Sequence, residues 1–183
     1  AMRGELAVSV RDMLQLALNV IAFIMALMAG RVVPMFTANG VPGTQPVRHG
    51  WLELAAMVSL IALAAVDLLP VSPPVVATVA ALATLAHASR LALWQPLRTL
   101  RHPIVWVLHV AYAWLVVYLA LRAASAAGLV TPGIAVHALT VGALGGLTLG
   151  MMTRTARGHS GRPLLASRAE IGCYVLINGA ALA

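Results

Sequence analysis

The sequence predicts an all-α fold, a polytopic transmembrane bundle of about six spanning helices. Of its 183 residues, 61% are hydrophobic, and the mean hydropathy is +0.93. Only 9% are charged, whereas soluble domains are about one-quarter charged. Apolar runs near the roughly 20 residues that cross a bilayer as a helix recur along the whole chain. Residues 1–183 therefore form a single transmembrane domain, and little chain is left for a soluble one.

The apolar runs give the boundaries of the expected helices. They are Met13–Gly30, Trp51–Leu69, Val75–Trp94, Pro103–Leu121, Ile134–Met152 and Leu164–Ala183. We expect helices because an open strand leaves its backbone polar groups unsatisfied in lipid. Breakers separate the runs in order: Pro42 and Gly43, then Pro70, Pro73 and Pro74, then Pro96, then Pro132 and Gly133, then Gly158 to Pro163. The connection from Arg31 to Gly50 is the only long loop expected.

The charge distribution predicts how the bundle is oriented. All twelve basic residues are arginine, against five acids, and the net charge is +7. The first, third and fifth connections contain Arg31, Arg48, Arg98, Arg101, Arg154, Arg157 and Arg162, whereas the opposite side contains Arg3, Arg11 and Arg122. The positive-inside rule places those three connections in the cytoplasm, facing anionic lipid. This arrangement explains the basic charge, so we expect no nucleic-acid partner.

Histidines inside the apolar runs are candidate functional residues, because ionisable groups are costly in a membrane. With a rise of 1.5 Å per residue, His87 and His109 both lie roughly 10 Å from the cytoplasmic surface. They can share a metal or face a haem from two sides. The alternative is that each forms a hydrogen bond across a helix interface. His137, a third candidate metal ligand, lies near the opposite surface and cannot share their ligand plane.

Glu170 falls at the depth of the two paired histidines. Three roles fit an acid at this level: a proton relay, a partner of a metal ligand, or a counter-ion to Arg90. The sequence leaves these three open.

The fifth connection, RTARGHSGRP, is rich in groups that bind anions. Arginine forks and exposed N–H groups suit carboxylate or phosphate, so haem propionates or a lipid headgroup would fit there. The alternative is an ordinary basic cytoplasmic loop. For an anion site we expect Arg31, and at least one of Arg154, Arg157 and Arg162, to turn inward over the bundle.

Two further patterns have structural interpretations. Gly142, Gly146 and Gly150 form a smooth stripe that predicts close packing against a neighbouring helix, with a flat ligand as the alternative. Three tryptophans, Trp51, Trp94 and Trp106, fall near predicted cytoplasmic ends, where an indole is favoured at the headgroup level.

Four motifs are spread along the chain. They are GRVVPMFTANG at Gly30 to Gly40, AHASRLALWQP at Ala86 to Pro96, RHPIVWVLHVAYAW at Arg101 to Trp114, and HALTVGALGGLTLGMMTRTARGHSGRPL at His137 to Leu164. Together they resemble the NnrS family of bacterial membrane proteins. Ser160 stands where that family commonly has threonine, which keeps the hydroxyl.

The resemblance implies a protein of the bacterial inner membrane that contains haem b and copper and is linked to nitric oxide protection and denitrification. It also implies that the chain is a fragment covering the sixth to eleventh of about twelve helices, with the remaining helices as partners. We therefore expect metal ligands among His87, His109 and His137. The expected cofactor-binding residues also include Arg31, Arg154, Arg157, His159 and Arg162.

The sequence leaves the biochemical role open. A redox enzyme acting on nitric oxide and a sensor both need only a metal that binds nitric oxide. A permease or cofactor-assembly scaffold, with no redox centre of its own, is the alternative. Broken helices or an internal repeat would favour transport, and neither is clear in the sequence.

Overall fold

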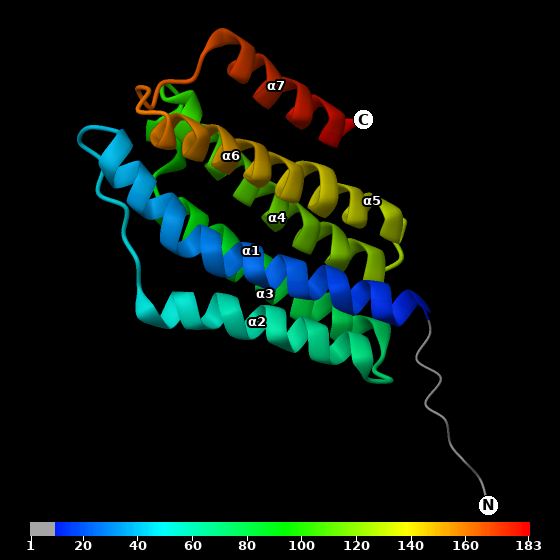
Figure 1. The fold of residues 1–183 in the computed structure, drawn as a ribbon. Helices are drawn as coiled ribbons and strands as arrows, with labels where there is room; N and C mark the ends of the chain where they lie inside the picture. The colour runs from blue at the N-terminus through cyan, green and yellow to red at the C-terminus, as the bar shows by residue number, and fades with distance from the viewer. Residues whose placement is uncertain (1–9) are drawn as a thin grey trace, which may run out of the picture.

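Figure 1 shows the computed structural model, a bundle of long helices that run side by side. It describes residues 10–183, so Arg3 lies outside the described part. The helices are α1 Val10–Gly40, α2 Gly50–Leu68, α3 Pro73–Leu93, α4 Pro103–Ala126, α5 Pro132–His137, α6 Gly146–His159 and α7 Arg168–Leu182. A short 3₁₀ helix, η1, covers Pro96–Thr99, and a π-helical segment, η2, covers Ala138–Gly145. Residues 10–183 contain no strand, so the all-α prediction is confirmed.

Five helical segments are long and apolar enough to cross a membrane. They are α1, α2, α3, α4 and the continuous stretch Pro132–His159 formed by α5, η2 and α6. The last helix, α7, is shorter at 15 residues. Exposed apolar side chains such as Leu54, Ile61, Leu82 and Leu85 cover the outer faces of α2 and α3, as a lipid environment requires. The prediction of a multi-pass bundle with about six helices is confirmed.

Helix α4 is the centre of the bundle. It contacts α1, α3, α5, η2 and α6, and its side chains Leu108, Leu115, Tyr118 and Leu119 are almost fully buried. Helix α7 contacts η2 and α6 and lies at the edge (Figure 1). Different faces of α4 therefore pack against most of the other helices.

The glycine stripe packs against α4, as predicted. A Cβ at Gly142 would lie 2.5 Å from the Trp114 ring, and a Cβ at Gly146 would lie 3.2 Å from the Ala111 Cβ. A Cβ at Gly150 would lie 2.8 Å from both Leu108 and Val107. Only a residue without a side chain permits this approach at Gly142 and Gly150.

The three arginine-rich connections meet at one end of the bundle, which we call the arginine end (Figure 1). The α1–α2 and α3–α4 connections are joined by hydrogen bonds, in which the Gln45 N–H donates to Gln95 Oε1 at 3.2 Å and Arg98 Nη1 donates to the Gly43 carbonyl at 2.9 Å. Asn39, Ile104 and Leu164 line one common cavity, so the α6–α7 connection lies there too. These connections share one end, as the topology predicted.

The first helix extends further than predicted. Arg31 to Gly40 continue α1, so the expected loop from Arg31 to Gly50 was wrong over most of its length. Pro34 removes one N–H from the helix but does not end it. The side chains of Val33 and Thr37 are fully buried, and this packing holds the last turns in place.

The last two predicted runs also differ at their ends. The helix expected at Ile134–Met152 runs from Pro132 to His159. The one expected at Leu164–Ala183 begins only at Arg168, because Ser167 and Glu170 form a capping box. In that box the Ser167 hydroxyl accepts the Glu170 N–H, which satisfies a free donor of the first turn.

Candidate functional site

A buried arginine lies at the centre of a polar cluster between four helices. Arg90 on α3 pairs with Glu53 on α2, with Nε 2.9 Å from Oε1 and Nη2 2.5 Å from Oε2. Its Nη1 donates to the Ala26 carbonyl on α1 and to the Tyr112 hydroxyl on α4, each at 2.9 Å. We call these residues, together with His87, the Arg90 cluster. It ties α1, α2, α3 and α4 together through one guanidinium.

Close packing on the neighbouring helices confines the guanidinium of Arg90 to one position. A Cβ at Gly30 would collide with Arg90 Nη2, so the arginine needs a glycine on the facing helix. On its other side the guanidinium carbon lies 5.2 Å from the Trp94 ring centroid. Trp94 is fully buried, so the headgroup position expected for it was wrong. Its indole instead packs on Tyr112, with ring centroids 4.6 Å apart.

Both ring nitrogens of His87 are engaged within the Arg90 cluster. Its Nε2 lies 3.0 Å from the Ala56 carbonyl, which can only accept, so Nε2 carries the proton. Its Nδ1 lies 2.6 Å from the Tyr112 hydroxyl. That hydroxyl accepts from Arg90 and donates to Nδ1. The direction of every hydrogen bond is therefore consistent, and His87 is neutral with no free nitrogen.

His109 is also buried but has a looser environment. Its Nδ1 lies 3.2 Å from the Val105 carbonyl, and its Nε2 lies 3.2 Å from the Thr37 hydroxyl on α1. The same hydroxyl lies 2.8 Å from the Val33 carbonyl, and it has only one proton to donate. Nε2 of His109 is thus less firmly bonded than either nitrogen of His87.

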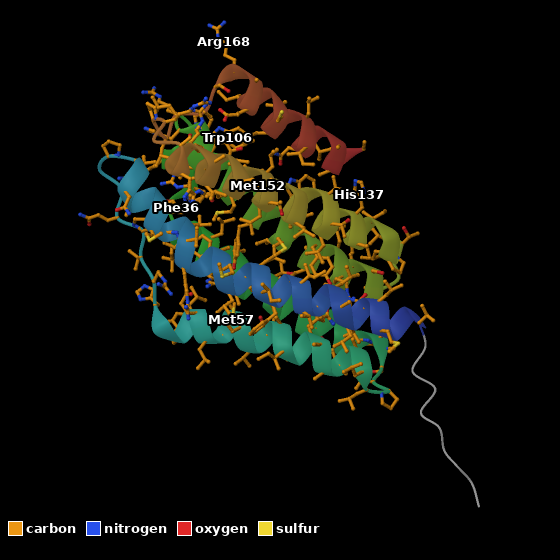
Figure 2. All side chains as sticks on the ribbon, viewed as in Figure 1. Phe36, Met57, Trp106, His137, Met152 and Arg168 are labelled. Carbon is orange, nitrogen blue, oxygen red and sulfur yellow. The ribbon has the colours of Figure 1, made fainter. Side chains whose placement is uncertain are left out.

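His87 and His109 do not face a common point. Their ring nitrogens contact different partners on different helices, Ala56 and Tyr112 for His87, and Thr37 for His109. His137 is exposed, and its Nε2 lies 3.0 Å from the Ala180 carbonyl of α7 (Figure 2). Across residues 10–183 no three His, Cys, Asp or Glu side chains are grouped to hold a metal.

A second polar cluster joins the helices at the end opposite the arginine end. Arg122 Nη2 on α4 lies 2.5 Å from Asp67 Oδ1 on α2. Asn19 on α1 donates to Asp67 Oδ2 at 2.8 Å. Arg122, assigned from sequence to an outer connection, is thus a helical residue with a structural partner. Ion pairs therefore join helices at both ends of the bundle. Arg90 and Glu53 join α3 to α2 toward the arginine end, and Arg122 and Asp67 join α4 to α2 at the other end.

The predicted arginines at the arginine end have different environments. Arg31, His159 and Arg162 are exposed, so the inward position expected for Arg31 was wrong. Its place on the outer side of α1 follows from the helix continuing past it. Arg154 is 9% exposed and turns inward. Its guanidinium carbon lies 3.8 Å from the Phe36 ring centroid, so the expectation of at least one inward arginine is confirmed.

Arg157 already has an anionic partner. Its Nε lies 3.0 and 3.1 Å from the two carboxyl oxygens of Glu170. These bonds, with one from the Ser167 N–H, lower the pKa of Glu170 to about 2. The carboxylate is therefore charged at neutral pH and neutralises Arg157. Glu170 is not the counter-ion of Arg90, a role that belongs to Glu53.

The sequence analysis missed Glu53 and Tyr112 as partners of Arg90. The signal for Glu53 was present: it is the third residue of a run that starts at the cytoplasmic end, and Arg90 lies one turn before the end of the next run. The depth argument that placed Glu170 near Arg90 applies equally to Glu53. Nothing comparable marked Tyr112, because its role depends on how α4 is rotated.

Comparison with known proteins gives one match. A family model described as NnrS protein matches residues 1–183. No curated protein and no solved structure matches the chain.

Proposed function

The chain belongs to the NnrS family over its full length, and on this premise we propose that it acts in nitric oxide metabolism, response or protection. The observation that supports this most strongly is the family match over residues 1–183, together with a multi-pass bundle of apolar helices. We place the protein in the bacterial inner membrane. The arginine end faces the cytoplasm in this proposal, because seven of ten loop and terminal arginines belong to its connections by sequence.

Haem b and copper are the cofactors we propose for the protein. A bound iron or copper centre would supply the metal orbital that takes up nitric oxide. Among the described histidines, His109 is the best candidate to contribute a ligand, because the Thr37 hydroxyl beside its Nε2 gives its proton to the Val33 carbonyl. His87 is instead a hydrogen-bonding residue of the Arg90 cluster.

The cofactor proposal is tested by the visible spectrum of the purified full-length protein. We expect a Soret band that shifts when nitric oxide is added to the reduced protein. His109→Ala should remove most of the band, because a haem ligand is lost. His49→Ala is the matched control, since His49 is exposed at the start of α2, and it should keep the band.

Two results would contradict these assignments. If His109→Ala left the band unchanged, His109 would not be a haem ligand. If metal analysis found neither haem nor copper in the full-length protein, a permease or cofactor-assembly scaffold would become the leading interpretation. The spectra of the variants therefore test the ligand assignment, and the metal analysis tests the cofactor proposal, so the two can fail separately.

A further inference from the structure

Arg154 is a buried residue that pairs with no carboxylate in the described part of the chain. It is 9% exposed, and its only recorded interaction among residues 10–183 is with the Phe36 ring, 3.8 Å away. Figure 2 shows Phe36 on α1, on the side of the bundle where α6 ends. Arg90, Arg122 and Arg157 each pair with a carboxylate at 2.5 Å. Among the side chains that the structure describes, no carboxylate pairs with Arg154, so its guanidinium is free to bind an anion.

A cavity of about 230 Å³ lies beside Arg154 at the arginine end. Three basic side chains line it, Arg101, His102 and Arg154, and no acidic residue does. His102 adds a buried Nδ1 with no hydrogen-bond partner in the described part of the chain. The basic lining and the unpaired nitrogen both suit a negatively charged ligand.

The backbone around this cavity also favours an anion. Helix α4 starts at Pro103, which lines the cavity together with Ile104. The N-terminus of a 24-residue helix carries a partial positive charge. Pro103 has no N–H and the N–H groups of Val105 and Trp106 donate to the His102 carbonyl, so the helix contributes mainly through its dipole. Asn39, near the end of α1, contributes an amide from the opposite wall.

A second hollow, of about 350 Å³, lies next to the same arginine. Phe36, Thr155 and His159 line it, and Arg154 and Leu164 line both cavities. Arg154 can therefore be approached from the surface of the arginine end, and a ligand need not cross the bundle.

We propose that the cavity lined by Arg101, His102 and Arg154 binds a phosphate group. A carboxylate has two oxygens and matches one arginine fork, as Glu170 matches Arg157 while it also accepts the Ser167 N–H. Two guanidinium groups and a histidine, beside the positive end of the α4 dipole, offer donors for three or four oxygens, as a phosphate requires. The group can come from free phosphate or from a lipid headgroup. This site stands independently of the proposed role in nitric oxide chemistry and of any haem.

The test uses the purified full-length protein in a neutral detergent, delipidated and free of phosphate. One arm adds inorganic phosphate, and the other adds short-chain phosphatidylglycerol, each against sodium chloride at equal ionic strength. We expect a saturable rise in the unfolding temperature with at least one probe. Saturation by inorganic phosphate assigns the site to free phosphate, and saturation by the lipid alone assigns it to a headgroup.

Variants locate the effect. Arg154→Gln should weaken binding by roughly 10-fold to 100-fold, the size expected for losing a charged hydrogen-bond donor. Without phosphate it should be at least as stable as the native chain, because it removes an unpaired charge. Arg101→Gln, at an exposed position, should also weaken binding. Arg168→Gln is the matched control, since Arg168 projects away from the bundle at the start of α7 (Figure 2).

Three outcomes would overturn the proposal. One is that neither probe stabilises the native protein more than sodium chloride does. Another is that both Arg154→Gln and Arg101→Gln bind as tightly as the native chain. The third is that Arg168→Gln loses as much affinity as Arg154→Gln, since binding would then be a general effect of basic charge.

Discussion

Replacing Arg90 with methionine should destabilise the bundle by about 3–5 kcal/mol, the usual cost of removing one partner from a buried ion pair. The change leaves Glu53 without its main partner, and it removes the donor to the Ala26 carbonyl and the Tyr112 hydroxyl. The side chains of Arg90 and Glu53 are only 3% and 19% exposed, so water does not replace the lost bonds. The measurement is the free energy of unfolding in mixed micelles.

Arg48→Met is the control for this experiment. Arg48 also contacts Glu53, at 3.4 Å, but its side chain is 46% exposed. An exposed pair contributes about 0–1 kcal/mol, so this variant should unfold almost as the native chain does. Equal effects of Arg48→Met and Arg90→Met would show that the Arg90 cluster does not hold the four helices together.

Adding a single methyl group at Gly142 should destabilise the bundle by about 1–3 kcal/mol, as overpacking commonly does. The new Cβ would lie 2.5 Å from the Trp114 ring. The ring cannot easily retreat, because Trp114 Nε1 donates to Asn178 Oδ1 on α7 at 2.8 Å. Gly142→Ala therefore strains the contacts of η2 with α4 and of α4 with α7. The same unfolding measurement applies.

Gly133→Ala separates packing from backbone effects. Gly133 belongs to the same continuous helical stretch, and nothing lies within 4 Å of a Cβ built there. Because alanine is the better helix former, this variant should be neutral or slightly stabilising. A loss of stability at Gly133 as large as that at Gly142 would mean that the close approach to Trp114 is not the cause.

Much of the fold could be predicted from sequence, because lipid imposes long apolar helices and the proline-rich connections separate them. The ends of the helices could not be predicted as well. Arg31 reads as a charged boundary, yet α1 runs on to Gly40 because Val33 and Thr37 are buried against the bundle. A charge sets the level of the membrane surface but does not stop a helix.

The sequence predicted how deep in the bundle the candidate site residues lie, but not which partners their side chains face. Depth follows from counting residues, and both His87 and His109 are buried as expected. Partners depend on helix rotation and on which helices are neighbours, which residue counting does not fix. His87 thus meets Tyr112 and Ala56, while His109 meets Thr37. Arg154 was among the predicted inward arginines, but only the packed structure reveals that no carboxylate among the described side chains pairs with it.

Growth after exposure to nitric oxide tests the proposed role most directly. A strain lacking this gene would carry either the native full-length protein or an empty vector, and the lag before growth would be measured with and without a nitric-oxide-releasing compound. We predict that the native protein shortens the lag under nitric oxide and leaves growth without nitric oxide unchanged. Equal lags in the two strains under nitric oxide, with the protein present in the membrane, would contradict a role in nitric oxide metabolism, response or protection.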